Sequence, residues 1–367
     1  MKCKHISFAK DFSDGGISTS VSSIILSQKF LGLDSSWATT KNKNIFQIAK
    51  IFKKEKETIY HVHGLWRRPT AYLSKNNISS HFIISPHGML SKWALERSSL
   101  KKKIALAFWE KESFKKAFCL HALSDSEVEQ IKNIDESLPV ALIPNCIENN
   151  FSEYASLKKG EIREMCGFSK LGISSNDKIL LYIGRFHEGK NLDLLIKIWS
   201  QIIKDVKKNS WKLIIIGDGL MKGKLESLNY IYSDAKNYWF LLPPRFNEEK
   251  FLSYYASDAF ILCSDSEALP MSPLEAMSTG LFCLLSKECN LNDFVNQKLA
   301  LGIEKNEIKF KEALLKLIYQ SPIEREKLKI QIINYLKNNY SKKVIGKKYI
   351  ELYSWIYNRN NKPNFIY

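Results

Sequence analysis

No apolar run in this 367-residue sequence approaches the ~20 residues that a membrane-spanning helix needs. The segment Met1 to Lys10 contains no apolar core of signal-peptide length, so we expect a cytoplasmic protein. The sequence has no low-complexity tract and no repeat with a period of about 20–50 residues, which excludes solenoid and propeller architectures. Apolar residues make up 45% and charged residues 25%, the balance of a globular protein that is long enough for two domains.

The sequence also lacks the spacings of a metal site. Its seven cysteines form no CxxC pair and no zinc-ligand pattern, and several, such as Cys263, lie inside apolar runs. No DxD motif occurs, and Asp265-Ser266-Glu267 is the nearest approach to one. We therefore expect buried, reduced thiols and no bound metal.

Acidic residues are the scarcer charged class, with 38 Asp and Glu against 55 Lys and Arg, which gives a net charge of +17. Binding to a nucleic acid, to an anionic membrane surface or to a phosphate-bearing substrate would explain this charge. A Lys-rich composition without any such partner would explain it as well. No recognised nucleic-acid-binding motif is present, so a basic nucleic-acid-binding protein is a remote alternative.

The segment Lys92–Phe118 combines many basic residues with Ile104, Phe108 and Trp109. It predicts either a basic amphipathic helix on a membrane or the solvated face of a domain helix.

Short apolar runs alternate with helix-period segments along the chain, which is typical of parallel sheets covered on both faces. The strands predicted for the first half are His5–Ala9, Ile59–His63, His81–Ile84, Cys119–Leu123 and Val140–Ile143, with helices between them such as Ile17–Leu31 and Leu100–Phe118. After a polar connection over 148–178 with one short helix, the strands of the second half are Ile179–Ile183, Leu213–Ile216, Trp239–Leu242, Phe260–Cys263 and Leu281–Leu285. The tail Glu304–Tyr357 is helical by pattern.

This alternation predicts an α/β protein with two Rossmann-like, doubly wound domains that face each other across a cleft. Residues 1–147 would form the N-terminal domain and residues 148–340 the C-terminal domain. Residues 341–367 would form a C-terminal helix that packs back on the N-terminal domain. Doubly wound domains bind ligands at the carboxyl ends of their strands.

Glycines and cations follow the predicted strands. Gly15-Gly16 follows the first strand and opens a helix, which suits either a close approach to a phosphate or an ordinary turn. The loop Gly184–Asn191 carries Arg185 and Lys190, two cations that suit a diphosphate or simply a solvated basic loop. Gly217 ends the next strand and permits a tight turn, with or without a ligand beside it.

The segment Ser264–Gly280 is the most informative part of the sequence. Ser272 as N-cap, Pro273 at the first helical position and Glu275 at the third predict a capping box, which gives Glu275 a purely structural interpretation. Glu267 and Glu275 beside a helix N-terminus could also accept hydrogen bonds from sugar hydroxyls, while backbone N–H groups face a phosphate.

Taken in order, these motifs resemble glycosyltransferase family 4, whose members are retaining enzymes of GT-B fold. The resemblance covers nearly the whole chain and rests on Gly15-Gly16, Ser85-Pro86-His87-Gly88-Met89-Leu90, Ile143-Pro144-Asn145, Gly184-Arg185 with Lys190, and Glu267–Glu275. The run from His87 to Leu95 is similar to members that build bacterial surface polysaccharides. The sequence departs from the family at Glu267-Ala268, where Glu-Gly is usual, and at Pro243-Pro244-Arg245, where a glycine turn near the base is common.

The resemblance implies a role for each candidate residue. Arg185 and Lys190 would hold the donor diphosphate, and Glu275 would bind the ribose hydroxyls. Glu267 would contact the donor sugar, and His87 would face that sugar near the reaction centre, unless hydrogen bonds within its turn account for the histidine. Gly16 would approach the diphosphate from the other domain. The remaining donor-binding residues would be Gly15, Gly217, Leu269, Pro270 and Met271.

The implied reaction is a retaining, metal-independent transfer of a hexosyl or related sugar from a nucleotide diphosphate, with no cofactor. The acceptor would be a saccharide or a polyprenyl-linked saccharide in lipopolysaccharide, O-antigen, capsule or exopolysaccharide synthesis. Such acceptors would place the protein at the cytoplasmic face of the inner membrane. A related GT-B phosphorylase or sugar-nucleotide epimerase is the alternative within this fold.

Overall fold

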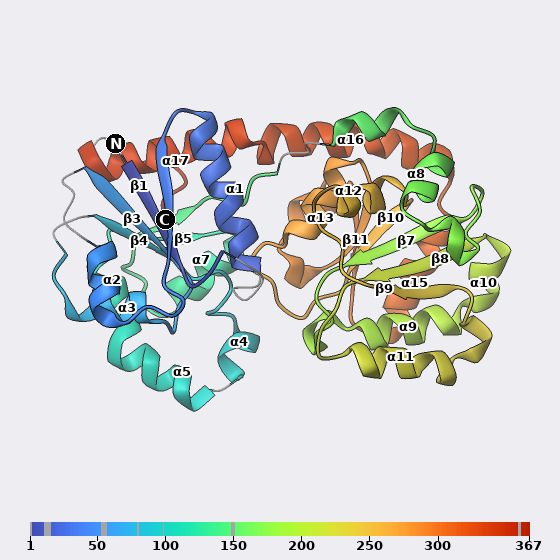
Figure 1. Cartoon of the computed structure of the whole chain (residues 1–367), viewed down its shortest axis with the longest axis horizontal. Helices are drawn as coiled ribbons and strands as arrows, with labels where there is room; N and C mark the ends of the chain where they lie inside the picture. The colour runs from blue at the N-terminus through green and yellow to red at the C-terminus, as the bar shows by residue number, and fades with distance from the viewer. Residues whose placement is uncertain are drawn as a thin grey trace. The chain divides into compact units, whose positions relative to one another are not determined.

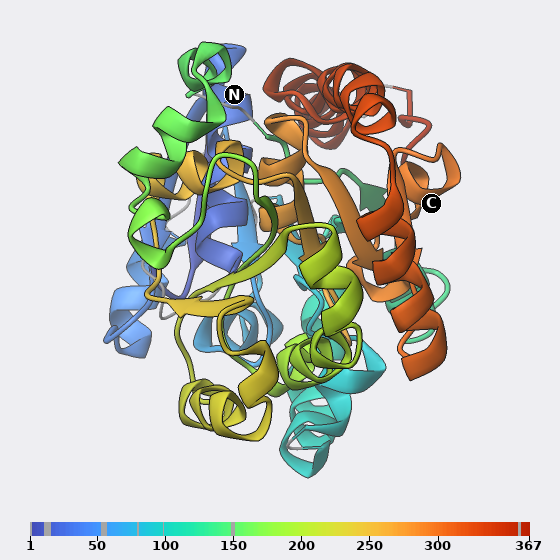
Figure 2. The same ribbon diagram turned by 90° about the vertical axis from the view of Figure 1, so that its right-hand side faces the viewer.

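The chain is described by a computed structural model that covers residues 2–10, 16–52, 57–78, 81–97, 99–147, 151–358 and 361–367. It divides into two compact units, Met1–Ile147 with Asn338–Tyr367, and Glu148–Lys337. Each unit contains one parallel six-stranded sheet with helices on both faces (Figures 1 and 2). The predicted α/β class with two Rossmann-like sheets is confirmed.

The first sheet has the strand order β2-β1-β3-β4-β5-β6. Its strands are β1 (Lys2–Ser7), β2 (Asp34–Thr39), β3 (Thr58–His63), β4 (Phe82–Ser85), β5 (Cys119–Ala122) and β6 (Val140–Leu142). Five were expected from apolar runs. The edge strand β2 was missed because its sequence, Asp-Ser-Ser-Trp-Ala-Thr, is largely polar and carries no apolar alternation.

Two sets of helices cover the faces of this sheet. Helices α1 (Gly16–Phe30) and α17 (Lys342–Asn358) contact each other and cover one face, where Ile24 and Ile345 pack against Ile59 and Ile83. Helices α2 (Ile45–Ile51), α3 (Arg68–Lys75), α6 (Lys111–Lys116) and α7 (Asp125–Lys132) line the other face. Strand residues alternate between the two cores, so β3 sends odd-numbered residues toward α17 and even-numbered residues toward α3.

The second sheet has the order β12-β11-β10-β7-β8-β9. Its strands are β7 (Lys178–Ile183), β8 (Trp211–Ile216), β9 (Trp239–Leu242), β10 (Ala259–Leu262), β11 (Phe282–Ser286) and β12 (Ala300–Ile303). Helices α9 (Leu192–Gln201), α10 (Ile203–Lys208), α11 (Lys222–Ile231) and α15 (Glu307–Tyr319) form one contacting layer, and α8 (Lys159–Met165), α12 (Asn247–Tyr255) and α13 (Met271–Ser278) form the other (Figure 1). The short α14 (Asn292–Asn296) precedes β12, and α16 (Pro322–Tyr340) follows α15.

The structure corrects two local predictions. The segment Leu100–Phe118 is not one continuous α-helix, because α5 (Ser99–Ala105) leads into a π-helix over Leu106–Glu110 before α6 begins. The predicted capping box at Ser272 is also wrong, because α13 begins at Met271 with Pro270 as its N-cap and without a side-chain cap. Among the described residues, no helix is long and apolar enough to cross a membrane.

Two helical glycines provide a matched test of the α1–α17 packing. A Cβ at Gly346 of α17 would overlap the carbonyl oxygen of Ser27 in α1, so this glycine lets the two helices approach closely. A Cβ at the exposed Gly223 of α11 would meet no atom within 4 Å. We expect Gly346→Ala to destabilise the protein by about 1–3 kcal/mol through overpacking. Gly223→Ala should stabilise it by about 0.5–1 kcal/mol through helix propensity. Chemical denaturation of both variants checks this, and equal stability changes would contradict the close packing.

Candidate functional site

The chain direction across the second sheet reverses between β7 and β10. Strands β8 and β9 follow β7 on one side, and β10, β11 and β12 continue on the other. Loops that leave neighbouring strands at such a switch point diverge and open a crevice at the carboxyl edge of the sheet. The loops after β7 and β10 carry Arg185, Lys190 and Glu267, so three of the predicted site residues gather at this edge.

Side-chain and backbone hydrogen bonds tie these two loops together. The Asn191 side-chain amide donates to the carbonyl oxygen of Cys263 at 2.9 Å and to Asp265 Oδ1 at 2.8 Å. The backbone N–H of Asp265 donates to the carbonyl oxygen of Gly189 at 2.8 Å. Asn191 adopts a left-handed conformation with φ of 51°, which Asn tolerates better than most residues. The site residues are therefore carried on a loop pair that is fixed independently of any ligand.

Lys190 and Glu267 form an ion pair between these loops. Lys190 Nζ contacts Glu267 Oε1, and both side chains are largely shielded, with 22% and 15% of their surfaces exposed. Ser264 Oγ donates to the same carboxylate oxygen at 2.7 Å. The side-chain amide of Asn290 donates to the carbonyl oxygen of Glu267 at 2.7 Å and fixes the backbone beside it. The structure thus brings Lys190 and Glu267 together, which the sequence did not predict.

Arg185 is the exposed cation of the β7 loop. Its carbonyl oxygen accepts a hydrogen bond from the Tyr182 hydroxyl at 3.0 Å, which anchors the backbone while the side chain extends outward. Across the described residues, its guanidinium has no carboxylate partner or side-chain hydrogen bond. An Arg with its donors unused at the carboxyl edge of a doubly wound sheet is available to an anion.

Gly217 follows β8 and lies against the β7 loop. With φ of +155°, a Cβ there would clash with the carbonyl oxygen of Gly184. Gly219 has a similar φ of +152°, and a Cβ there would clash with the backbone of Phe186. Both glycines therefore let the β8 loop pack directly against the loop that carries Arg185, and this close approach explains Gly217 without a ligand.

Glu275 lies inside α13 and is only 6% exposed. The Tyr254 hydroxyl donates to Glu275 Oε2 at 2.8 Å, and Lys250 forms an ion pair with the same oxygen. Glu275 therefore bonds to side chains of α12 instead of capping its own helix. Leu269 is buried just before α13, and Pro270 and Met271 are half-buried at its start.

Two predicted residues of the first unit, Gly16 and His87, lie at the carboxyl edge of its sheet. Gly15 lies outside the described residues, and Gly16 is the exposed first residue of α1. His87 follows β4 in a left-handed conformation with φ of 55°. Both carboxylate oxygens of the buried Glu127 accept backbone hydrogen bonds, from Gly88 at 2.5 Å and from Leu123 at 2.8 Å, so the turn after His87 is held from α7. Burial raises the pKa of Glu127 to about 7.

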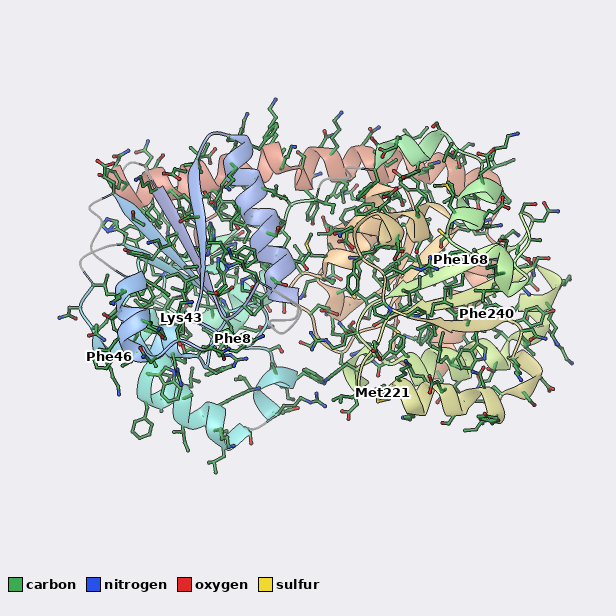
Figure 3. The ribbon with its side chains drawn as sticks, viewed as in Figure 1. Phe8, Lys43, Phe46, Phe168, Met221 and Phe240 are labelled. Carbon is green, nitrogen blue, oxygen red and sulfur yellow. The ribbon has the colours of Figure 1, made fainter. Side chains whose placement is uncertain are left out.

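A hollow of about 360 Å³ lies at the switch point of this sheet, near the ends of β1, β2 and β3. It is lined by Phe8, Thr40, Asn42, Trp66, Arg67 and Arg68. Phe8, labelled in Figure 3, lies under the Arg67 guanidinium at 4.3 Å from ring centroid to Cζ. An aromatic wall with two arginines suits a saccharide that carries an anionic group.

The buried Glu110 of the π-helix fixes one side of the hollow. Its Oε1 accepts hydrogen bonds from the Trp66 backbone at 2.6 Å, the Thr70 hydroxyl at 2.8 Å and the Trp109 indole at 3.0 Å. Its Oε2 is buried and has no hydrogen-bond partner among the residues that the structure describes, and burial raises the pKa of the carboxyl to about 7. Glu110 thus holds Trp66 in its left-handed conformation, with φ of 61°.

The sequence analysis missed a cluster of buried histidines behind His87. His5, His61 and His63 are buried, with ligand atoms within 4.8 Å of one another, and they are the group of described residues with the spacing to hold a metal ion. Their ring nitrogens already have hydrogen-bond partners inside the protein, and burial lowers the pKa of each imidazole. The signal was the alternation His61-Val62-His63, which places two histidines on one face of a strand.

Comparisons with known proteins agree with this architecture. The fold resembles that of Anabaena HepE in complex with UDP and glucose, with a TM-score of 0.73 at 14% identity over 96% of this chain and 99% of that chain. It also resembles sucrose-phosphate synthase from Thermosynechococcus elongatus, with a TM-score of 0.77 at 15% identity over 98% and 100% of the two chains. These similarities show a two-domain, Rossmann-like GT-B fold.

Two curated relatives are similar in sequence. One is the Escherichia coli UDP-Gal:alpha-D-GlcNAc-diphosphoundecaprenol alpha-1,3-galactosyltransferase, 28% identical over 66% of this chain and 61% of the relative. The other is the alpha-monoglucosyldiacylglycerol synthase of Streptococcus pneumoniae, 26% identical over 60% of this chain and 48% of the relative. The chain thus spans about half to three-fifths of the length of these proteins.

One family description matches the second unit. Residues 167–335 match the family Glycosyl transferases group 1, and this range includes the loops after β7 and β10 and the whole of α13. Residues 167–335 are therefore similar to glycosyl transferases group 1, the chain has a GT-B fold, and its sequence is similar to that of a bacterial galactosyltransferase.

Proposed function

We propose that this protein is a retaining glycosyltransferase of family 4. It moves a hexosyl or related sugar from a nucleotide diphosphate to a saccharide or lipid-linked saccharide, in the synthesis of a bacterial surface polysaccharide such as lipopolysaccharide, O-antigen, capsule or exopolysaccharide. The observation that carries the proposal is the cluster of Arg185, Lys190, Glu267 and the α13 N-terminus at the switch point of the second sheet. The family match encloses that cluster.

The cluster supplies the chemistry that a sugar diphosphate donor needs. Arg185 presents a planar set of donors to the diphosphate, and the free N–H groups at the start of α13 add partial positive charge. These groups stabilise the charge that develops on the leaving diphosphate. The acids nearby are already paired, Glu267 with Lys190, Asp265 with Lys305 and Glu275 with Lys250, so the donor set favours cationic stabilisation over a metal ion.

The ion pair of Lys190 and Glu267 gives each residue a defined task. When donor binds, Lys190 turns from Glu267 to the diphosphate, and Glu267 accepts hydrogen bonds from the hydroxyls of the donor sugar. Glu275 takes the ribose hydroxyls, with Tyr254 keeping its carboxylate oriented. His87 on the first unit faces the transferred sugar near the reaction centre.

The first unit supplies the acceptor side. The hollow with Trp66, Arg67 and Arg68 suits an acceptor that combines a sugar ring with a phosphate. The acceptor named for the Escherichia coli relative is an undecaprenol diphosphate carrying a sugar, a molecule of this class. Transfer with retention then places the acceptor hydroxyl on the same face of the donor sugar as the leaving diphosphate.

The helices α5 and α6, with the π-helix between them, present a surface that suits an anionic membrane. Leu100, Ile104 and Phe108 are spaced four residues apart and are 71%, 46% and 77% exposed. Lys101 and Lys103 flank this apolar stripe and are exposed, whereas Lys102 donates to the carbonyl oxygen of Ala94. An apolar stripe with flanking cations is typical of peripheral membrane binding, and it would bring the enzyme to a lipid-linked acceptor.

The donor site is tested by removing its exposed cation. Arg185→Ala should weaken binding of the nucleotide sugar by about 10-fold or more, because it removes a charge-assisted contact worth about 1.5–3 kcal/mol. Lys208→Ala is the control, since Lys208 ends α10 just before β8 and so lies at the opposite edge of the sheet. Thermal shift against a panel of nucleotide sugars and free nucleotides measures the effect. Equal shifts for wild type and Arg185→Ala would contradict the assignment.

Two amide substitutions separate the roles of the glutamates. Glu275→Gln should retain a bond to Tyr254 but weaken binding of the free nucleoside diphosphate, because a neutral amide holds ribose hydroxyls less strongly. Glu267→Gln should leave nucleotide affinity within about twofold and lower turnover by about 10–100-fold, the cost of losing a contact to the sugar. Nucleotide titration and turnover on both variants decide the matter. Normal turnover in both would remove the two carboxylates from the mechanism.

Membrane binding is tested on vesicles. The protein should bind vesicles that contain anionic lipid, and rising salt should release it. Lys101→Glu with Lys103→Glu should reduce binding, and Phe108→Ser should weaken the part that persists at high salt, because the first change removes charge and the second removes apolar contact. Sedimentation with vesicles measures both. Equal binding to neutral and anionic vesicles would rule out the electrostatic component.

A further inference from the structure

Five of the seven histidines form one hydrogen-bonded network in the first unit. They are His5 on β1, His61 and His63 on β3, His87 after β4 and His121 on β5. A neutral imidazole has one N–H donor and one lone-pair acceptor. An obligate acceptor at one end of the network therefore dictates where every other hydrogen lies.

The backbone carbonyl oxygen of Ile143 is that acceptor. It lies 2.8 Å from His121 Nε2, so Nε2 carries the hydrogen and His121 Nδ1 is an acceptor. Ser85 Oγ lies 2.7 Å from His121 Nδ1 and donates to it. Ser85 Oγ in turn accepts from His61 Nε2 at 2.6 Å, which leaves His61 Nδ1 as an acceptor.

Tyr353 and Gln28 continue this donor-to-acceptor order from His61 to His5. The Tyr353 hydroxyl lies 3.2 Å from His61 Nδ1 and gives it its single hydrogen. The hydroxyl oxygen therefore accepts from the side-chain amide nitrogen of Gln28 at 2.8 Å. This orientation turns the amide oxygen of Gln28 toward His5 Nε2, which donates to it at 2.9 Å.

The last two links lead to His87. His5 Nδ1 accepts from His63 Nε2 at 2.9 Å, and His63 Nδ1 accepts from His87 Nε2 at 2.8 Å. His87 Nδ1 thus keeps its lone pair, and it has no hydrogen-bond partner within the described part of the chain. His87 itself is half-buried, whereas the other four imidazoles are fully buried.

We propose that this network holds His87 as the Nε2–H tautomer and presents its bare Nδ1 as a hydrogen-bond acceptor to the substrate. His63 and His5 act as positioning residues, and Gln28 sets the polarity of the last three imidazoles. The group that faces Nδ1 must then be a donor, a sugar hydroxyl and not a phosphate oxygen. A role of this lone pair in turnover rests on the proposed glycosyl transfer, whereas the tautomer of His87 does not.

The surroundings keep the imidazoles neutral. No charged side chain in the described ranges hydrogen-bonds to any of the five rings. Burial lowers the pKa of His5 and of His121 to about 4 and lowers the pKa of His87 as well. Their mutual repulsion, were they charged, acts in the same direction.

The same contacts argue against a metal at His5, His61 and His63. The 2.9 Å contact between His5 Nδ1 and His63 Nε2 is a hydrogen bond that occupies the lone pair of His5 Nδ1 and the N–H of His63 Nε2. The rings of His61 and His63 are stacked with centroids 4.3 Å apart, and both nitrogens of His61 are bonded to hydroxyls. A metal ion at these rings would have to displace hydrogen bonds that they already make, so we assign the ring nitrogens to the hydrogen-bond network.

The tautomers can be read directly in the whole protein. Labelling of histidine with ¹⁵N and long-range ¹H–¹⁵N correlation spectra distinguish the Nε2–H, Nδ1–H and imidazolium forms, and His87→Gln identifies the signals of His87. We expect five neutral Nε2–H imidazoles at pH 7, with His87 Nδ1 in the unprotonated range. An Nδ1–H or imidazolium form of His87 would overturn the proposal, whether or not the protein transfers sugars.

Variants at His63 test the link to turnover. His63→Leu removes the acceptor for His87 Nε2–H, so the His87 signals should shift toward a mixture of forms. Turnover should fall by about 10–100-fold, the range seen when a partner that orients a functional histidine is lost, while KM for the donor changes by less than about threefold. His63→Gln can both accept from His87 and donate to His5, so it should restore most of the turnover and the wild-type His87 signals.

Val62→Ala is the matched control for loss of stability. Val62 is fully buried beside His63, but its side chain points to the opposite face of β3. The Val62→Ala substitution should lower the melting temperature without changing the His87 signals or turnover. Unchanged turnover and unchanged His87 signals in His63→Leu would refute the positioning role, while activity in the wild type would leave the proposed function intact. Absence of transfer in every variant, with the tautomers as expected, would instead remove the proposed function.

Discussion

The parallel direction of the strands is the constraint on which the candidate site depends. All strands of a parallel sheet end at the same edge, so loops that are far apart in sequence meet there without any contact between their helices. In the second unit this edge brings the loops after β7 and β10 together, and Asn191 then bonds across them. In the first unit it brings His87 and Gly16 to one edge. The sheets thus determine where the functional side chains lie, and the loop sequences determine which side chains these are.

Apolar strands could be read from the sequence because burial on both faces requires continuous apolar runs. Trp239–Leu242 was predicted at its observed bounds, and β12 was missed because Ala300-Leu301-Gly302-Ile303 is short and contains a glycine. The edge strand β2 could not be found in this way, because a strand with one neighbour and polar residues has no burial pattern to detect. The prediction of a capping box at Ser272 was wrong for another reason. The Glu275 carboxylate bonds to Tyr254 and Lys250 of α12, and these tertiary contacts replace the local capping bond.

The cations of the site could be predicted because a charged residue directly after a strand has few structural uses. Their partners could not, since the pairing of Lys190 with Glu267 joins residues 77 positions apart. The histidine network is an extreme case. Its members come from four strands, a turn and two helices, and each residue alone has an ordinary interpretation. Only the alternation of His61 and His63 on one strand face hinted that imidazoles gather beneath His87.

The network also explains why α17 is more than an apolar cover for the first sheet. An apolar helix would bury Ile59 and Ile83 equally well, but Tyr353 supplies the one hydroxyl that both donates to His61 and accepts from Gln28. Buried polar groups are costly unless every donor and acceptor is matched, so such a network is favourable only as a complete set. When every donor and acceptor is matched, only one arrangement of the hydrogens on the ring nitrogens and hydroxyls satisfies the network. Helix α17 therefore helps to determine which nitrogen of His87, at the carboxyl edge of the sheet, carries the hydrogen, and it does so through a series of matched polar contacts.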